Sequence, residues 1–418
     1  MKIECLGGFR EVGRNGVLID SAEKILLDFG LNVEDTEPPI MPKKVDHCLV
    51  AHAHLDHIGC TPMLNKFNCP LYSSAATFDQ GALLLRDSLK VARLKGKNLL
   101  FTENDIEKAK KKEKIVTYGQ AIETNKAKIE VHNAGHVPGS IMYIIEIEGK
   151  RILYTSDFSM RDSRLLKGAN INELKDIDVM IIESTYAAKE HPDRAKTEKE
   201  LYKVVSETIQ NGGIALIPAF AVGRSAEILM VLNSFKPKFK IYMDGMAREA
   251  TEIALKYPEL LRSSKDLNNA MNKVDMIYNN EQRHEVIKEP CAIITTGGCI
   301  DGGPAIQYIR NLWSKEVNSL NFTGFQIPKT AGRYLLDTGR FVNEETDLKL
   351  KMQINSFDFS AHADRNDLFK FINKIQPEKV MCMHGDNCQR FAQELRSRGF
   401  NAIAPKNGEI VDTKKWKE

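Results

Sequence analysis

The first half of the chain alternates short apolar runs with turn residues, a pattern that predicts β-strands. The predicted strands cover residues 3–6, 17–19, 25–27, 48–51, 129–132, 142–147, 152–155 and 179–182. A long stretch with helical spacing, residues 75–94, interrupts them. A weak capping box at Thr102 predicts that a second helix begins there and continues through the lysine-rich residues 108–114. We interpret these lysines as a solvated helix face rather than an RNA-contacting patch.

The pattern changes after residue 186, where apolar strands and amphipathic helices follow one another in turn. Strands are predicted at 214–217, 241–243 and 292–295, and helices at 198–209, 225–232, 246–255 and 305–313. Such alternation is typical of parallel βα units. From residue 351 a strand, a helix (364–372), a strand (380–383) and a helix (388–396) follow. Residues 258–290 show no clear pattern.

Composition narrows the class of protein. A chain of 418 residues with 42% hydrophobic and 28% charged residues is expected to fold into two or three globular domains. No apolar run approaches the roughly 18 residues that a spanning helix needs, and the N-terminus lacks an apolar signal region, so we expect a cytoplasmic protein with no membrane contact. The net charge of +3 neither favours nor excludes nucleic acid. The eight cysteines form no C-x-x-C pair, so we expect reduced core residues.

Histidines carry the candidate chemistry. An apolar strand at 48–51 is followed directly by a loop that contains His52, His54, Asp56 and His57. Imidazole and carboxylate groups are the ligands that zinc prefers, and a strand delivers such a loop to the edge of its sheet. A polar loop with chance histidines is the alternative, and this density of ligand-type side chains disfavours it.

Further ligands are expected where other predicted strands end. These are His136, Asp157 and His384. We expect His52, His54 and His136 to bind one ion, Asp56, His57 and His384 to bind a second, and Asp157 to bridge them. Two ions about 3.5–4 Å apart, each with an open position, describe a hydrolytic two-metal site.

These residues resemble those of the metallo-β-lactamase superfamily, in which His-x-His-x-Asp-His is the signature motif. Asp28, in the string Leu-Leu-Asp-Phe-Gly, resembles the structural aspartate of the superfamily's first motif. The superfamily implies metal-dependent hydrolysis, but its substrates include thioesters, lactams, lactones and phosphodiesters.

Later strings resemble the β-CASP branch, whose members cut nucleic acids. Residues 183–186 (Glu-Ser-Thr-Tyr) resemble motif A, 359–364 (Phe-Ser-Ala-His-Ala-Asp) motif B, and 383–385 (Met-His-Gly) motif C. The residues of motif B and the opening residues 6–14 are most similar to those of archaeal homologues of the cleavage and polyadenylation specificity factor endonuclease subunit. The KH domains that some of these homologues carry are not expected here. RNA-cutting members carry histidine in motif C, so His384 favours RNA. Ser156 and Ala187 stand where the family usually has glycine, and neither change removes a ligand.

The resemblance implies an α/β fold, an αββα metallo-β-lactamase sandwich with an inserted parallel α/β β-CASP domain. Residues 1–187 would form the first part of the sandwich, 188–345 the β-CASP domain, and 346–418 the second part of the sandwich. The implied cofactor is two zinc ions per chain. The implied partner is single-stranded RNA, with a homodimer and an RNA-processing or decay complex as further expectations.

The resemblance also suggests roles for single residues. Asp56 would accept a proton from the attacking water, and His362, oriented by Glu183, would contact the phosphate or protonate the leaving oxygen. A packed histidine at a helix N-terminus is the alternative for His362. Ser360, Arg224 and Arg333 are expected to contact the substrate, and a structural salt bridge is an equal alternative for each arginine. The expected products are a 5′-phosphate and a 3′-hydroxyl.

Three classes of function stay open at this point: a metal-dependent ribonuclease, a small-molecule metallo-hydrolase and a non-catalytic RNA-binding subunit. An endonuclease in RNA 3′-end processing or decay is favoured over a 5′-to-3′ exoribonuclease of the RNase J type. A small-molecule metallo-hydrolase would not need the inserted domain. A non-catalytic RNA-binding subunit is disfavoured because degenerate members of the family lose metal ligands, whereas all the expected ligands are present here.

We predict about two zinc ions per chain in protein purified without added metal, because the expected ligands exceed what one tetrahedral ion can use. Elemental analysis of the purified protein measures this directly. A metal content near zero, together with activity that survives chelators, contradicts the prediction.

Overall fold

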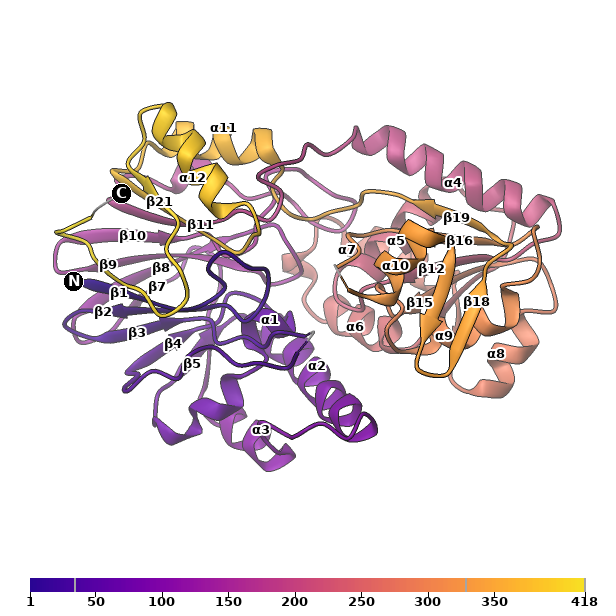
Figure 1. The fold of residues 1–418 in the computed structure, drawn as a ribbon, viewed down its shortest axis with the longest axis horizontal. Coiled ribbons are helices and arrows are strands. Elements are labelled where there is room, and N and C mark those ends of the chain that lie inside the picture. Colours follow the sequence, from indigo (N-terminus) through magenta and orange to yellow (C-terminus); the bar gives the residue numbers. More distant parts are fainter. Residues whose placement is uncertain (34, 328, 417–418) are drawn as a thin grey trace. The chain divides into compact units, whose positions relative to one another are not determined.

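The computed structural model describes residues 1–33, 35–327 and 329–416 (Figure 1). The described chain divides into two compact units. Unit 1 combines Met1–Asp162, Lys167–Glu190 and Ala361–Glu418, and unit 2 combines Ser163–Leu166 with His191–Ser360. Unit 1 is therefore assembled from segments on both sides of unit 2 in the sequence.

Unit 1 contains two β-sheets. The first has the order β22-β1-β2-β3-β4-β5-β6, and the second has the order β21-β20-β11-β10-β9-β8-β7. The strands of the first sheet are β1 (Lys2–Gly7), β2 (Gly16–Asp20), β3 (Lys24–Leu27), β4 (His47–Leu49), β5 (Leu71–Ser73), β6 (Glu113–Ile115) and β22 (Ile410–Asp412). Those of the second are β7 (Ala121–Glu123), β8 (Ala127–Asn133), β9 (Ile141–Ile147), β10 (Lys150–Tyr154), β11 (Val179–Glu183), β20 (Lys379–Met383) and β21 (Ala402–Ile403).

Alternating side chains pack the two sheets together. In β11, Val179 and Ile181 enter a core shared with strands of the first sheet, whereas Met180 and Ile182 face the opposite way. This period of two is what a strand that is buried on both faces requires. The outer face of the second sheet is covered by α11 (Arg365–Ile375) and α12 (Cys388–Ser397).

The outer face of the first sheet packs against α1 (Leu55–Ile58), α2 (Ala75–Leu94) and α3 (Glu103–Lys110). The layers of unit 1 are thus helix, sheet, sheet, helix, which confirms the predicted αββα sandwich.

Unit 2 is built on a parallel sheet with the order β14-β13-β15-β12-β16-β19. Its strands are β12 (Ala215–Ala219), β13 (Ile241–Asp244), β14 (Asp275–Ile277), β15 (Ala292–Thr296), β16 (Ser319–Phe322) and β19 (Gln353–Ser356). One face packs on α4 (Arg194–Gln210), α5 (Arg224–Ser234), α6 (Met246–Leu255) and α7 (Ser264–Met271), and the other on α9 (Pro304–Leu312) and α10 (Ala331–Thr338). The predicted parallel α/β architecture of the inserted segment is confirmed.

Several predicted elements have different limits. The strand predicted at 48–51 ends at Leu49, because the Ala51 amide donates to the Asp28 carboxylate (2.6 Å) instead of to a strand. The helix at Thr102 ends at Lys110, and the last of the lysine-rich residues belong to β6, which pairs with β5. Residues 258–290, which carried no prediction, form α7, β14 and the helix α8 (Asn280–Val286).

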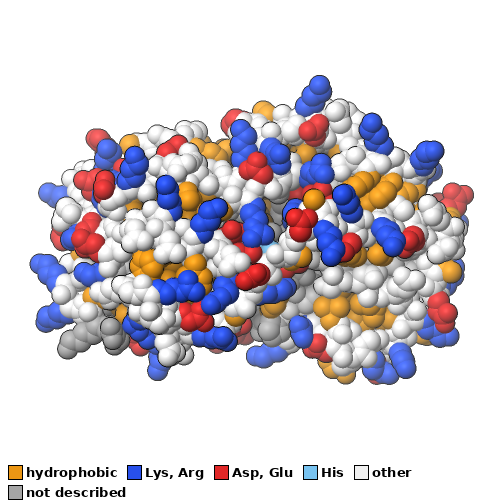
Figure 2. Space-filling model, turned by 90° about the horizontal axis from the view of Figure 1, so that it is seen from above, with side chains coloured by type: hydrophobic (Ala, Val, Ile, Leu, Met, Phe, Trp, Pro, Cys, Tyr) orange, Lys and Arg blue, Asp and Glu red, His pale blue; other side chains and the backbone are white. Residues whose placement is uncertain are grey.

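The charged side chains and the cysteines lie where the composition leads us to expect them. Figure 2 shows Lys and Arg side chains spread over the face in view with Asp and Glu side chains between them. All eight cysteines are free and buried, as predicted. Within the described residues, no helix has the length and apolar character that crossing a membrane would require.

Candidate metal centre

The candidate centre lies where strands of both sheets of unit 1 end. β10, β11 and β20 are neighbouring parallel strands, so their carboxyl ends meet at one edge of the second sheet. Asp157 follows β10, Glu183 is the last residue of β11, and His384 follows β20. The loop after β4 brings His52 and its neighbours to the same place from the first sheet, and His136 lies between β8 and β9.

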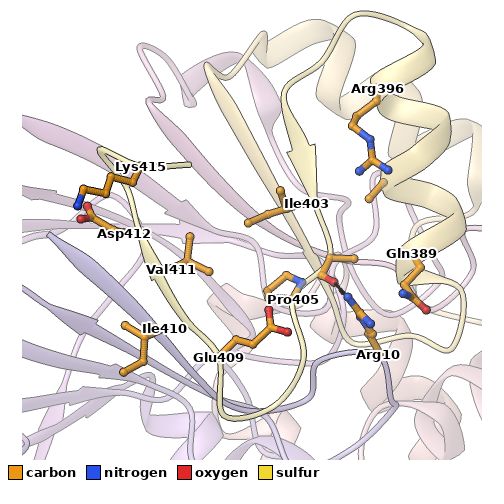
Figure 3. Close-up of a pocket in the computed structure, with 12 residues that line it drawn as sticks. Arg10, Gln389, Arg396, Ile403, Pro405, Glu409, Ile410, Val411, Asp412 and Lys415 are labelled. Atoms are coloured by element: carbon orange, nitrogen blue, oxygen red, sulfur yellow. Dashed lines mark hydrogen bonds between the residues drawn. The ribbon is translucent and has the colours of Figure 1, made fainter. Parts of the chain in front are cut away.

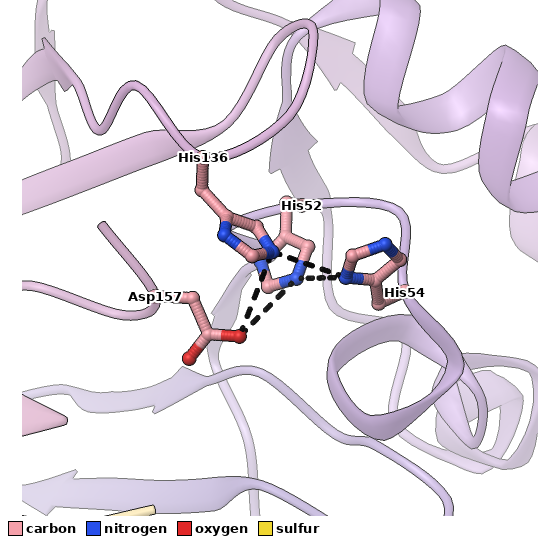
Figure 4. Close-up of side chains that lie close together, drawn as sticks. All are labelled: His52, His54, His136 and Asp157. Atoms are coloured by element: carbon pink, nitrogen blue, oxygen red, sulfur yellow. Dashed lines mark hydrogen bonds and ion pairs between the residues drawn. The ribbon is translucent and has the colours of Figure 1, made fainter. Parts of the chain in front are cut away.

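One group consists of His52, His54, His136 and Asp157 (Figure 4). Nδ1 of His54 lies 3.1 Å from Nε2 of His52 and 3.2 Å from Nε2 of His136. Oδ2 of Asp157 lies 3.7 Å and 3.8 Å from the same two Nε2 atoms. These separations are close to the edge of a tetrahedron around zinc, about 3.3 Å for metal–nitrogen bonds of about 2.0–2.1 Å. The donor set therefore fits a divalent cation.

A second group consists of Asp56, His57, Asp157 and His384. Nε2 of His57 lies 3.3 Å from Asp157 Oδ2, and Nε2 of His384 lies 3.4 Å from Asp157 Oδ1. Oδ2 of Asp56 lies 3.7 Å from His57 Nε2 and 3.6 Å from His384 Nε2. Asp157 thus presents one oxygen to both groups and the other to His384.

An orphaned polar atom supports the same fit. Among the described residues, Oδ1 of Asp157 is buried without a hydrogen-bond partner. A buried carboxylate oxygen without such a partner is costly unless a cation compensates it. Every residue that the sequence predicts as a metal ligand lies in one of the two groups.

Neighbouring groups fix which nitrogen of His57 and of His136 faces the centre. Nδ1 of His57 donates to Oδ2 of Asp28 (2.7 Å), which also accepts from the Tyr154 hydroxyl (2.7 Å). Nδ1 of His136 donates to the Ala361 carbonyl (3.0 Å). In both residues Nε2 is left to face the group. Such outer partners set the tautomer of a ligating histidine.

Burial and neighbouring charges shift the pKa values of the histidines in different directions. Burial, together with neighbouring histidines, lowers the pKa of His52 and of His136 well below the usual value, and that of His54 to about 4. These rings are therefore neutral near pH 7, the form that can ligate a metal. Burial also acts against protonation of His57, but Asp157, Asp56 and Asp28 outweigh it and raise its pKa.

His362 and Glu183 form a pair beside the first group. Nδ1 of His362 donates to the Glu183 carboxylate at 2.9 Å, and the His362 and His136 ring centroids are 4.6 Å apart. Glu183 is buried and also accepts from the Phe158 amide (2.9 Å). Burial disfavours the imidazolium form of His362, but Glu183 and Asp157 outweigh burial and raise its pKa to about 9. The pair can hold a proton near the centre.

The predicted substrate-binding residues belong to unit 2. The Ser360 amide donates to Asp358 (3.0 Å), and the Arg224 guanidinium donates to the Thr323 carbonyl. Arg333 is half exposed and pairs with Asp337 one helical turn later (2.6 Å). The salt bridge expected as an alternative is therefore present for Arg333.

Sequence reasoning missed two residues of the centre. Nδ2 of Asn15, which is fully buried, lies 3.0 Å from His57 Nε2 and donates to the Asp56 carbonyl (3.0 Å). Tyr154 ends β10 and reaches Asp28 across the core. Asn15 directly follows the opening string at residues 6–14, so its position was a usable signal, whereas nothing in the sequence distinguishes Tyr154 from a core tyrosine.

A separate cavity of about 450 Å³ lies beside the C-terminal strands of unit 1 (Figure 3). Its lining includes Arg10, Arg396, Ile403, Glu409 and Lys415. The Arg10 guanidinium donates to the Ala404 carbonyl (2.7 Å). None of the lining residues described belongs to the predicted site. Its mixed charges do not favour an anion over a cation.

Family models match successive parts of the chain. Residues 17–185 match a metallo-β-lactamase superfamily domain, 226–335 a Beta-Casp domain, and 347–405 a Zn-dependent metallo-hydrolase RNA specificity domain. A protein named probable RNase MJ4 from Methanocaldococcus jannaschii is 36% identical, over 98% of this chain and 100% of its own length. The chain belongs to the β-CASP family of the metallo-β-lactamase superfamily. This confirms the resemblance and the class of enzyme, a metallo-hydrolase.

Two further relatives match nearly the whole of this chain. The RNase aCSPSF2 of Saccharolobus solfataricus is 34% identical, over 98% of this chain and 85% of its own. The transcription termination factor FttA of M. jannaschii is 35% identical, over 95% of this chain and 69% of its own. A crystal structure of a protein of unknown function from Enterococcus faecalis shares the fold, with a TM-score of 0.64, 15% identity and 98% and 99% of the two chains covered.

We predict that Asp28→Asn lowers metal affinity by about 10–100-fold, because Asp28 sets the tautomer of His57. Isothermal titration of metal-free protein with zinc measures the affinity. Tyr154→Phe is the matched control, since it removes one donor to Asp28 and leaves the His57 contact. Equal affinities for Asp28→Asn and the native protein would contradict the role given to Asp28.

Proposed function

We propose that the chain is a zinc-dependent ribonuclease that hydrolyses RNA phosphodiester bonds with two metal ions. The observation that carries this proposal is the sharing of Asp157 between the two groups of ligand atoms. The match to an RNA specificity domain and the relatives named as RNases support RNA as the substrate. We further propose that it acts in the cytoplasm as an endonuclease in RNA 3′-end processing or decay.

The two ions would be held by the two groups described above, one by His52, His54 and His136, the other by Asp56, His57 and His384, with Asp157 between them. When bound, such ions supply Lewis acidity, which lowers the pKa of water to about 7 and neutralises charge on the scissile phosphate. Asp157 fixes the position of the two groups relative to each other, because one of its oxygens faces His57 and the other faces His384.

The chain's own residues move the protons. Asp56, a member of the second group, is partly exposed and can also accept a proton from the attacking water. His362, kept protonated by Glu183, can give a proton to the leaving 3′ oxygen as its bond to phosphorus breaks. The products are a 5′-phosphate and a 3′-hydroxyl. Ser360, two residues from His362, is proposed to contact the substrate.

We propose the same domain limits that the sequence predicts: residues 1–187 and 346–418 as the metallo-β-lactamase domain and 188–345 as the β-CASP domain. The compact units change at Glu190, close to the first limit, and at Ala361, beyond the second limit and after β19, which pairs with β16 in the unit 2 sheet. The Beta-Casp match falls inside the insert. We also propose a homodimer that works within an RNA-processing or decay complex. Light scattering of the purified protein measures the number of chains.

A 5′-to-3′ exoribonuclease is the second candidate, since the relatives include an RNase J-like protein at 34% identity. RNA labelled at its 3′ end, with and without a 5′-phosphate, distinguishes the two actions. Labelled internal-cut fragments that are independent of the 5′ end support the endonuclease. Progressive shortening of the labelled strand from its 5′ end, only when that end carries a phosphate, supports the exonuclease. A small-molecule hydrolase or a non-catalytic RNA-binding subunit would leave both substrates uncut.

We predict that His362→Ala keeps its metal but cleaves RNA about 10²–10⁴-fold more slowly, because it removes a proton donor and no ligand. His384→Ala is the matched comparison, and we expect it to lose metal. Metal content by elemental analysis and rates on a labelled RNA separate the two effects. Loss of zinc from the His362 variant would show that this ring belongs to the metal centre.

We predict that Arg224→Ala weakens RNA cleavage, because the Thr323 carbonyl holds the Arg224 guanidinium at the carboxyl edge of the unit 2 sheet. Arg333→Ala is the comparison, and we expect a smaller loss because Asp337 already pairs with Arg333. If Arg224 contacts phosphate, the loss is similar for different RNA sequences and the salt dependence becomes shallower. Cleavage rates across a salt series measure this. An earlier thermal unfolding of Arg224→Ala with unchanged salt dependence would make it a structural residue.

A further inference from the structure

At the carboxyl edge of the unit 2 sheet, the helices that follow neighbouring strands pack on opposite faces of the sheet. β12 lies between β15 and β16 and is followed by α5, which packs on one face of the sheet. β15 and β16 are followed by α9 and α10, which pack on the opposite face. The loop after β12 therefore leaves the sheet in the opposite direction from the loops of both its neighbours. Open parallel sheets bind their ligands outside the carboxyl ends of strands at such a point.

Phe220 occupies this point, since it is the first residue after β12. A β-carbon placed on Gly298, in the loop after β15, would lie 3.4 Å from its Cδ1 atom. A β-carbon placed on Gly324, in the loop after β16, would lie 3.4 Å from Cε2, on the other side of the ring. The two glycines thus lie close to opposite sides of one phenyl ring, Gly298 also against the Phe220 backbone amide, and larger residues at these positions would crowd the ring.

The ring stays accessible although it is bordered on two sides. Phe220 is 38% exposed, and Phe325, which directly follows Gly324, is 48% exposed. Single exposed apolar residues are common, but here two phenyl rings are exposed on the loops that follow two neighbouring strands of the sheet. The side chain of Arg224 lies at the same place, because the β-carbon placed on Gly324 would be 3.8 Å from its Nη1 atom. The guanidinium is held there by the Thr323 carbonyl.

We propose that Phe220 is a stacking platform for one base of single-stranded RNA, with the Arg224 guanidinium beside it for the backbone phosphate. The proposal rests on the proposed ribonuclease function and adds to it a side chain of unit 2 that grips the substrate. A planar base can stack on a phenyl ring that is bordered by glycines rather than by bulky side chains. Such stacking does not depend on which base it is. The adjacent Arg224 guanidinium can pair with the negatively charged backbone phosphate of the same nucleotide.

The test measures binding of a 5′-fluorescein-labelled single-stranded RNA by anisotropy, with every variant made in the His362→Ala background, where cleavage is slow. Phe220→Ala should weaken binding by about 5- to 150-fold, the range that loss of one stacked base gives. Phe220→Trp should retain affinity, whereas Phe220→Leu, apolar but not aromatic, should lose most of it.

A matched control is available on the same sheet edge. Tyr278 follows β14 and is 64% exposed, but the Arg248 guanidinium already lies over its ring, 4.2 Å from the centroid. We expect Tyr278→Ala to bind RNA like the background protein. An equal loss for Tyr278→Ala and Phe220→Ala would overturn the assignment of stacking to Phe220.

An abasic scan tests the contact itself. One nucleotide at a time in the RNA is replaced by its abasic form, and binding to the background protein is compared with binding to its Phe220→Ala variant. At the stacked position the difference between the two proteins should disappear, and at other positions it should persist. A penalty that is the same for every abasic RNA overturns the proposal, as does full affinity of Phe220→Leu, which would indicate an apolar contact with another occupant such as a protein segment.

Failure of this inference can be told apart from failure of the proposed function. If the native protein neither binds nor cuts RNA, the ribonuclease itself is wrong. If the native protein cuts RNA and Phe220→Ala binds it as tightly as the background protein, the function stands and the platform alone is overturned.

Discussion

One buried carboxylate organises the structure of unit 1. Asp157 is 2% exposed and lies within ion-pair distance of histidines from several strands. Burying such a charge is costly unless partners surround it. Burial alone would raise the pKa of Asp157, but His384, His57 and His362 together hold it well below the usual value. In this buried position the carboxylate stays ionised because the loops from both sheets bring their histidines to it, so the packing of the sandwich and the arrangement of the centre are coupled.

That convergence explains why ligands lie far apart in the sequence. Two parallel sheet segments end at one edge, and each contributes its first residues beyond the strand. The amide of His384 donates to the Gly8 carbonyl (2.6 Å) and its carbonyl accepts from the Thr185 hydroxyl (3.1 Å), so the N-terminal loop and motif A both position it. His384 also adopts a φ of +50°, as does the nearby Ser156 at +49°, a conformation that glycine adopts most easily. The glycine usual in the family at position 156 is explained by this backbone.

Much of the fold followed from periodicity because its elements are long or strongly patterned. The helices at 75–94 and 246–255 have the predicted limits, and the apolar runs that became β1, β2 and β9 are buried on both faces. Short elements such as β14 carry too few residues for a period to stand out. At the centre, residue types after strands indicated which side chains meet, but not which atoms face each other. That depends on partners such as the Ala361 carbonyl, whose role no side-chain pattern records.

The pairing of β22 with β1 joins residues 410–412 to residues 2–4 and has a consequence for synthesis on the ribosome. Unit 2 is almost continuous in the sequence, so it can fold while the later strands are still being made. Unit 1 cannot close until β20 and β22 have emerged, because they complete its two sheets and β20 delivers His384. A nascent chain that carries most of the ligands therefore lacks a finished second group. The order of translation keeps the hydrolytic centre incomplete until β20 and His384 have been made.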